Sequence, residues 1–542
     1  MREVGERAPA DPADPADPAE ALPAPPLLGS TAAVAAGNLV SRITGFVRVL
    51  AIALALGTTF AGNTYQTSNL VSNVLFELMA AGLLSSVMVP PFVRLLDEGR
   101  GEDAERLAGA VLGVALAVLG VIVALGIILR PWIMRALTVA VDQPGVRHQE
   151  VVLGSFLLVF FLPQVLLYAV GSVATGLLYG ARRFAAAAFA PVANNLVVIA
   201  TMLAFWALVG GRPGLHLSTT ERLVLGVGTT AGVLAMSLAP VLALRRAGVR
   251  LRPRWNLGED GLRRLGRDGG WAAGLLALNQ LLVVTTLILA NHVEGGVVAY
   301  NIAFQVFLLP FALLSHPVMT TLYPGLAADA QARRWPQFRE QLGGGVATVA
   351  FLVLPAAALL VALAQPVFDV LRLGNLDAAG ATLAGELVAA YALGLVGYAV
   401  FQLMVRASYA AGDTRTPTLV ALGVTVTGSA LMVVWFALAS GQGRLAAVGF
   451  GHSIAYIGGA VALAVCLGRD RLPLRIGANV ARSAACAAGA GLVAWLIGHA
   501  VATGSRPTGV AALAVGGAAG ALVYLGAQRA LGSPQLAALR RS

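Results

Sequence analysis

Apolar runs separated by short polar connections make up most of this chain. A scan with a window of about 19 residues resolves fourteen runs, each long enough to cross the hydrocarbon core of a bilayer as a helix. The predicted spans cover approximately 31–56, 63–89, 107–129, 151–178, 184–209, 223–244, 270–292, 296–322, 343–364, 382–408, 417–440, 446–467, 483–500 and 508–528. The pattern therefore predicts an all-α polytopic membrane protein with about 14 transmembrane helices.

Composition supports this fold class. The chain has 542 residues, of which 58% are hydrophobic and 12% are charged. A soluble domain is typically about half apolar and a quarter charged, so a large soluble domain is excluded. Cys466 and Cys486 lie in apolar runs, with no CxxC pair or histidine cluster beside them. We therefore expect no cofactor and no metal site.

Arginine placement predicts the orientation. All 37 basic residues are arginine, against 26 acids, which gives a net charge of +11. With the N-terminus inside, the inner segments hold 27 arginines and the outer loops hold 8. Cytoplasmic loops are enriched in basic residues, so both termini are predicted to be cytoplasmic. In so apolar a chain the charge excess indicates an anionic inner leaflet and not a nucleic acid.

The spans group into two halves with a faint internal repeat. Pro191 and Pro417 open corresponding helices 226 residues apart, and Pro90 and Pro324 lie 234 residues apart. Similar offsets suggest a duplicated six-helix unit around a central cavity, as in many transporters. The expected organisation is a disordered Asp/Pro/Ala-rich cytoplasmic tail at 1–29, an N-terminal six-helix lobe at 30–246, an Arg-rich cytoplasmic linker at 247–269, a C-terminal six-helix lobe at 270–467, and helices 13 and 14 with a cytoplasmic tail at 468–542.

Two arginines inside the first span are the strongest functional signal. Arg42 and Arg48 lie about 120° apart around a helix and about 9 Å apart along it, so both can border one broad cavity. A mid-membrane arginine is costly unless it faces water, an acid or an anionic ligand. Guanidinium groups suit bidentate phosphate binding. The structural alternative is an ion pair with a buried acid, for which Glu77 is the nearest candidate in sequence.

Other polar residues cluster in the first two spans of each half. Singly, such residues more often form interhelical hydrogen bonds than contact a ligand, but their concentration suggests a polar interior. They are Asn38, Ser41, Asn69 and Asn73 in the first half, and Asn279, Gln280, Asn301, Gln305 and His316 in the second.

Three motifs resemble a known family. The stretch LVSRITGFVRVLAIALALG with a second helix ending GLLSSVMVPPF, the connection GLLYGARRFAAAAFAPVANNLVVI, and YALGLVGYAVFQLMVRASYAAGDTRTPT occur in this order. Together they resemble the MviN/MurJ lipid II flippases of the multidrug/oligosaccharidyl-lipid/polysaccharide exporter superfamily. The resemblance covers about residues 30–530.

The resemblance implies a flippase of the bacterial plasma membrane. It would move undecaprenyl-diphosphate-linked peptidoglycan precursor from the inner to the outer leaflet by alternating access, and so serve cell-wall biogenesis and cell shape. Cell-wall synthesis and division proteins are further expected partners. The expected substrate-binding set is Arg42, Arg48, Asn38, Glu77, Asn73 and Gln305.

The sequence departs from the family pattern at several charged positions. Asn63, Phe76 and Gln305 stand where the family commonly has an acidic residue and two basic residues, and the span at 270–292 lacks the acid expected of a sodium site. Two alternatives therefore remain open: another exporter of the superfamily, for a lipid-linked polysaccharide or a drug, and a transport-inactive scaffold of cell-wall assembly. An enzyme acting on the same lipid is disfavoured, because the loops hold no DxD or HExxH motif.

Overall fold

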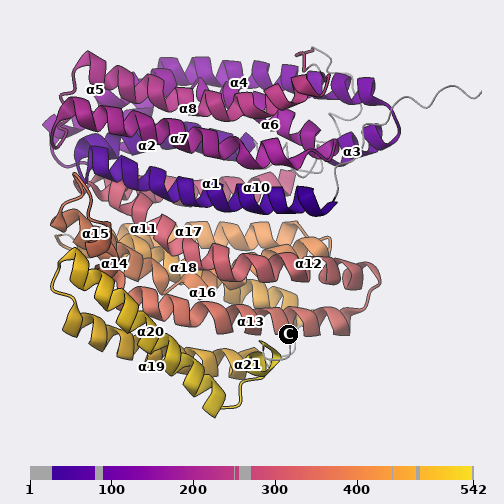
Figure 1. Ribbon diagram of the computed structural model, residues 1–542, viewed down its shortest axis with the longest axis vertical. Coiled ribbons are helices and arrows are strands. Elements are labelled where there is room, and N and C mark those ends of the chain that lie inside the picture. Colours follow the sequence, from indigo (N-terminus) through magenta and orange to yellow (C-terminus); the bar gives the residue numbers. More distant parts are fainter. Residues whose placement is uncertain are drawn as a thin grey trace, which may run out of the picture.

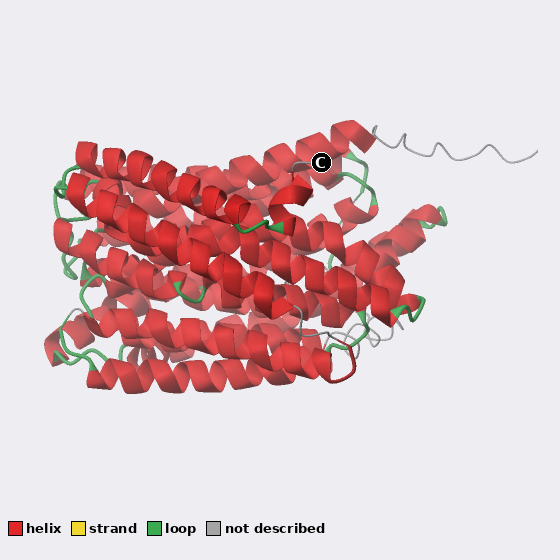
Figure 2. Ribbon diagram, turned by 90° about the horizontal axis from the view of Figure 1, so that it is seen from below, coloured by secondary structure: helices red, strands yellow, loops and turns green. Residues whose placement is uncertain are grey.

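The computed structural model describes residues 27–79, 89–249, 251–254, 270–441, 443–471 and 476–539, and these contain helices and no strand. The predictions for a disordered tail at 1–29 and a linker at 247–269 fall mostly outside the described residues. The long helices run along one common direction, with the connecting loops gathered at the two ends (Figure 2).

The N-terminal lobe is built around α1, α7 and α8, which pack against one another in that order, while α2 packs on α5 and α4 on α5 and α6. Leu56, Tyr65, Phe161 and Phe205 are fully buried among them. The helices are α1 (Leu27–Leu56), α2 (Phe60–Met79), α3 (Val89–Asp97), α4 (Gly101–Leu137), α5 (Pro144–Phe161), α6 (Gln164–Gly180), α7 (Phe184–Val209) and α8 (Thr219–Arg246).

The C-terminal lobe lies beside it and carries the last helices on its far side (Figure 1). Its core is aromatic, with Phe307 packed against Tyr391 and His452. The helices are α10 (Gly270–Asn291), α11 (Gly296–Pro310), the π-helical turn η2 (Phe311–Ser315), α12 (His316–Gln331), α13 (Trp335–Ala362), α14 (Ala364–Leu371), α15 (Ala378–Ala392), α16 (Leu395–Ala410), α17 (Arg415–Leu438) and α18 (Gly443–Arg471). Beyond it lie α19 (Ile476–Val501), α20 (Arg506–Ala530) and the short α21 (Pro534–Leu539).

The predicted fold class is confirmed. Twelve helical segments are long and apolar enough to cross a membrane, and α15 with α16, bent by 50°, makes a thirteenth. Helix α2 is the remaining predicted span. It is less apolar than the other spans because polar side chains are frequent between Asn63 and Asn73. Asn63, Thr67, Ser68 and Ser72 of this helix are all fully buried.

Two predicted spans are interrupted helices. The span at 151–178 divides into α5 and α6 at Leu162 and Pro163, since proline cannot donate the backbone hydrogen bond that would continue the helix. The span at 382–408 divides into α15 and α16 at Leu393 and Gly394. Corresponding helices of the two lobes are therefore broken at corresponding places.

Backbone conformation gives further evidence for a duplicated design. Residues with positive φ follow corresponding helices of both lobes at separations of 238, 234, 230 and 231 residues, in the pairs Gly57 and Gly295, Gly99 and Arg333, Arg182 and Gly412, and Gly210 and Gly441. At the third pair the same cap follows, because the amide of Arg183 donates to the Leu178 carbonyl and that of Asp413 to the Ser408 carbonyl. The two lobes thus repeat one chain path in the same orientation.

Candidate functional site

Arg42 lies where α1 faces the C-terminal lobe. Its charge acts on His316 at the start of α12, and the charge of Arg406 on α16 acts on the same imidazole. Helices α12 and α16 pack together. Arg42 is exposed and Arg406 is half-buried, and the charges of both guanidinium groups act on His316 from different lobes.

Arg48, six residues further along α1, is directed into the N-terminal lobe. Its charge acts on the phenol groups of Tyr65 on α2 and Tyr168 on α6. Its Nε atom is buried and has no hydrogen-bond partner among the described residues. The two α1 arginines therefore lie on adjoining faces of the helix, one toward the seam between the lobes and one toward the polar interior of the N-terminal lobe.

The other predicted site residues lie at different distances from these cations. Asn73 on α2 accepts a hydrogen bond from Tyr168 Oη at 3.3 Å, which places it beside the phenol that Arg48 faces. Asn38 is exposed one turn before the first arginine, and Gln305 is half-buried on α11. Glu77 is exposed near the end of α2, and no ion pair joins it to an arginine within the described parts of the chain.

The two seam arginines and the neighbouring Arg48 share one electrostatic property. Neither Arg42, Arg48 nor Arg406 forms an ion pair with any carboxylate that the structure describes. An unpaired guanidinium inside a membrane bundle is costly and is retained where it faces water or binds an anion. The site can therefore hold an anionic group between the lobes, with donors from both of them.

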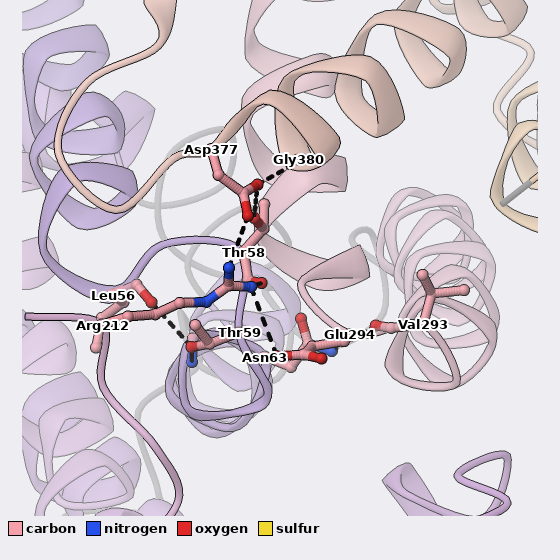
Figure 3. A network of polar contacts seen from close by, with 10 residues as sticks. Leu56, Thr58, Thr59, Asn63, Arg212, Val293, Glu294, Asp377 and Gly380 are labelled. Atoms are coloured by element: carbon pink, nitrogen blue, oxygen red, sulfur yellow. Dashed lines mark hydrogen bonds and ion pairs between the residues drawn. The ribbon is translucent and has the colours of Figure 1, made fainter.

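One end of the seam is closed by hydrogen bonds between the lobes (Figure 3). Arg212, in the loop between α7 and α8, donates from Nη1 to Asp377 Oδ2 at 2.6 Å and from Nη2 to the Thr58 carbonyl at 2.8 Å. It also lies 3.6 Å from Glu294 Oε1. We call this group, with the neighbouring Asn63 and Asn375, the interlobe clamp.

Asp377 is ionised in the clamp. Burial by itself would raise the pKa of its carboxyl. Hydrogen bonds from the Gly380 amide and Arg212 lower this pKa by more than burial raises it, so the pKa lies below the ordinary 3.8. A group with a depressed pKa stabilises the closed state above its ordinary pKa, and this stabilisation is lost only as the pH falls through the lowered value. The ion pair is therefore complete at neutral and mildly acidic pH.

Backbone contacts bring the lobes close together at the clamp. Asn375 donates from its amide to the Leu54 carbonyl at 3.0 Å, and from Nδ2 to the Ala55 carbonyl at 2.9 Å. Gly57 has a φ of +61°, and a Cβ there would lie 2.5 Å from the Asn375 oxygen. Only glycine combines this backbone conformation with so close an approach.

Asn63 joins the lobes with both ends of its side-chain amide. Its Nδ2 donates to the Val293 carbonyl at 2.9 Å, and its Oδ1 accepts from the Val297 amide at 3.0 Å. The side chain is completely buried. An amide can donate and accept at once, whereas an ionised carboxylate can only accept. The two hydrogen bonds between the lobes thus explain why an amide, and not a carboxylate, fits at position 63.

We expect Asn63→Asp to destabilise the protein by about 1–3 kcal/mol, because the buried Val293 carbonyl loses its donor and faces an acceptor. The measurement is thermal unfolding of the purified protein in detergent. Gln337→Glu makes the same chemical change on an exposed residue and should leave the melting temperature nearly unchanged. Equal melting temperatures for both variants would show that the Asn63 bonds contribute little.

A second pair of contacts lies next to the clamp. Asn291, at the end of α10, donates from Nδ2 to Thr67 Oγ1 at 3.0 Å and to the Leu137 carbonyl at 3.1 Å. His292 Nδ1 lies 2.7 Å from the Ala140 carbonyl. Among the described residues, all hydrogen bonds and ion pairs between the lobes lie at this end of the bundle. The described polar contacts thus join the lobes at the clamp end of the bundle only.

An apolar groove lies on the outer side of the C-terminal lobe, between α19 and the helices α13, α16 and α18. Its volume is about 1180 Å³. Leu354, Val396, Val461, Ala487 and Trp495 are among the residues that line it. Its lining is suited to a hydrocarbon chain.

Sequence reasoning missed Arg406 and most of the clamp. Arg406 lies two residues before the predicted end of its span, and an arginine at a span end ordinarily reaches the membrane surface. Its place at the seam follows only from the packing of α16 on α12. Asp377, Asn375 and Arg212 lie in loops of different lobes. One signal was available, since Asp377 precedes a helix and its side chain accepts from the Gly380 amide as an N-cap.

Known proteins resemble this chain over most of its length. The family model described as lipid II flippase MurJ matches residues 52–510. A protein from Rhizobium meliloti (strain 1021) named probable lipid II flippase MurJ is 28% identical over 425 residues, which cover 76% of each chain. The lipid II flippase MurJ of Burkholderia cenocepacia is 27% identical over 427 residues, or 76% of this chain and 79% of that protein.

Solved structures show the same fold. A lipid II flippase MurJ in an inward closed conformation superposes with a TM-score of 0.74 at 17% identity, over 92% of this chain and 99% of that one. A MATE family multidrug transporter of the MOP superfamily, in an inward-facing conformation, gives 0.64 at 14% identity, over 80% and 94%. These structures thus share the fold of this chain. Because the family model matches most of the sequence, the chain belongs to the MurJ family of lipid II flippases.

Proposed function

We propose that this protein is a lipid II flippase, which moves undecaprenyl-diphosphate-linked peptidoglycan precursor from the inner to the outer leaflet by alternating access. The observation that carries the proposal is the set of unpaired cations at the seam and beside it on α1. Arg42 and Arg406 come from different lobes and act on one imidazole, and Arg48 lies six residues from Arg42 on α1. A diphosphate would bind where the two lobes can both reach it.

The substrate explains why such a seam is needed. Its polyprenyl tail is stable in lipid, but the hydrocarbon core excludes its diphosphate and glycan, so unaided flipping is slow. Guanidinium groups in a wet cavity replace the water that the phosphates lose. Asn38, Asn73 and Gln305 offer further hydrogen bonds to the sugar and phosphate. Glu77, which forms no ion pair with a described arginine, would accept hydrogen bonds from the sugar hydroxyls.

The clamp supplies the alternating gate. Its exposed ion pairs each contribute about 1 kcal/mol or less, so they add little to the cost of reopening the closed end. Opening the clamp while the opposite end closes would expose the bound diphosphate to the other side of the membrane. The groove beside α19 offers the polyprenyl tail an apolar path outside the polar seam.

The proposed orientation has both termini in the cytoplasm and the clamp at the outer surface, and the surrounding membrane is the bacterial plasma membrane. In a background without native cysteines, Ser505→Cys should react with an impermeant thiol reagent added to intact cells. Gln331→Cys, on the opposite end of the bundle, should react only after permeabilisation. Both residues are exposed. The reverse labelling pattern would invert the proposed direction of transport.

The function is tested by growth of a bacterium depleted of its own lipid II flippase. We expect this chain to restore growth. A transport-inactive scaffold would reach the membrane at normal yield and fail to do so, and an exporter of another lipid-linked polysaccharide or of a drug would fail in the same way. Contacts with cell-wall synthesis and division proteins belong to the proposal as further partners of a working flippase.

A further inference from the structure

A second cationic site lies in the N-terminal lobe, apart from the arginines at and beside the seam. A pocket of about 700 Å³ opens between the end of α4, the start of α5 and the start of α8. We call it the α4–α5–α8 pocket. Five of its lining residues are basic: Arg130, Arg135, Arg147, His148 and Arg222. One lining residue, Asp142, is acidic.

The charges of the four arginines are not neutralised by acids within the described structure. None of them forms an ion pair with an acid in the described ranges. Arg130 donates from Nη1 to the Ile127 carbonyl at 2.8 Å, and Arg222 donates from Nε to the Leu217 carbonyl at 2.8 Å. These bonds hold two of the guanidinium groups in place by one nitrogen each. The other nitrogens remain free to meet an anion.

Most of the remaining lining is apolar and reaches the surface of the bundle. Val151, Val152, Phe156 and Val159 extend from the cationic rim along α5, and Val152 is 46% exposed. The Ser155 hydroxyl, among these residues, is buried and unpartnered in the described structure. The pocket thus combines phosphate-binding donors at one end with a hydrocarbon-binding surface at the other.

The number of arginines here is unusual for this end of the bundle. On the proposed orientation this is the outer side, where the sequence places only eight arginines in all. Four of those eight line this one pocket. Basic residues are disfavoured on the outer side, so their convergence around a cavity without acid partners indicates a ligand.

We propose that the α4–α5–α8 pocket binds the phosphate of an anionic phospholipid, whose acyl chain lies along the α5 valines. The site is distinct from the seam that carries the proposed transport function. It also adjoins the interlobe contacts, because Asp142 Oδ2 lies 3.5 Å from His292 Nδ1. A bound lipid would therefore hold the loop between α4 and α5 against the C-terminal lobe.

Trp132 provides a probe for this site, since the Arg135 guanidinium lies 5.0 Å from its ring centre. The full-length protein is placed in vesicles containing brominated phosphatidylglycerol or brominated phosphatidylcholine. The quenching assigned to Trp132 is the difference between the wild type and Trp132→Phe. We expect quenching by phosphatidylglycerol to exceed that by phosphatidylcholine, and the preference to fall about fivefold for each arginine removed in Arg147→Gln/Arg222→Gln.

Three comparisons decide the outcome. Arg506→Gln, at the same end of the bundle but outside the pocket, should keep the preference. Inorganic phosphate at millimolar concentration should leave it unchanged, because the free ion lacks the acyl chain, and loss of the preference in phosphate would assign the site to the free ion instead of the lipid. Equal quenching of the wild type by the two lipids, or an unchanged preference in the double variant, would overturn the site.

Discussion

Alanine at either α1 arginine is expected to abolish flippase activity. Arg42→Ala and Arg48→Ala each remove charge-assisted hydrogen bonds of about 1.5–3 kcal/mol to a diphosphate, and two such bonds correspond to roughly 100-fold or more in rate if they form in transport. Lysine at the same position keeps the charge but loses the planar fork. We therefore expect Arg→Lys variants to retain partial activity.

The readouts are growth of flippase-depleted cells and the yield of folded membrane protein. Yield should stay normal, because loss of a mid-membrane charge makes α1 more apolar. Arg529→Ala, an exposed arginine at the end of α20, is the matched control. If the arginines served only to neutralise a buried acid, alanine would instead lower the yield, and full growth at normal yield would exclude them from the site.

A covalent link across the clamp is expected to stop transport reversibly. A Cβ built on Gly380 in α15 would lie 2.8 Å from the Thr58 Cβ, and a disulfide needs about 3.5–4.5 Å between these atoms. In a background without Cys466 and Cys486, the two cysteines of Thr58→Cys/Gly380→Cys should therefore form a disulfide once their backbones move slightly apart. Closure of the clamp would then be permanent until a reductant is added.

A link within one lobe provides the control. A Cβ on Gly428 in α17 would lie 3.0 Å from the Ala455 Cβ in α18, so Gly428→Cys/Ala455→Cys joins two helices that move together. We expect translocation by the oxidised clamp pair to fall at least tenfold and to return on reduction, while the control pair stays active. Unimpaired transport by the fully oxidised clamp pair would show that the lobes do not separate there.

The length and number of the apolar runs were sufficient to predict the fold class. They located α2 despite that helix's polar side chains, because the whole segment from 63 to 89 remains apolar on average. The apolar runs did not show the breaks after Phe161 and Ala392, because an apolar run of the same length can form one continuous helix or two shorter ones. Proline at 163 was a local signal for the first break, whereas Gly394 alone is ambiguous among many membrane glycines.

The site was only partly predictable for a different reason. Arg42 and Arg48 are conspicuous because a charge inside an apolar run is costly wherever the run packs. Arg406 and the Arg212–Asp377 pair depend on which helices and loops meet across the lobes, and no local pattern encodes that pairing. Glu77 was the nearest acid within a predicted span, yet α2 places it where no ion pair with the described arginines forms.

The most direct test of the central claim is translocation of fluorescent lipid II by the purified protein in liposomes, measured as protection from an external quencher. The wild type should move the lipid well above the rate in protein-free vesicles, and Arg42→Ala/Arg48→Ala should reduce movement to that background while remaining folded. Translocation by the double variant at the wild-type rate would contradict the seam as the diphosphate site, and no translocation by the wild type would contradict the flippase itself.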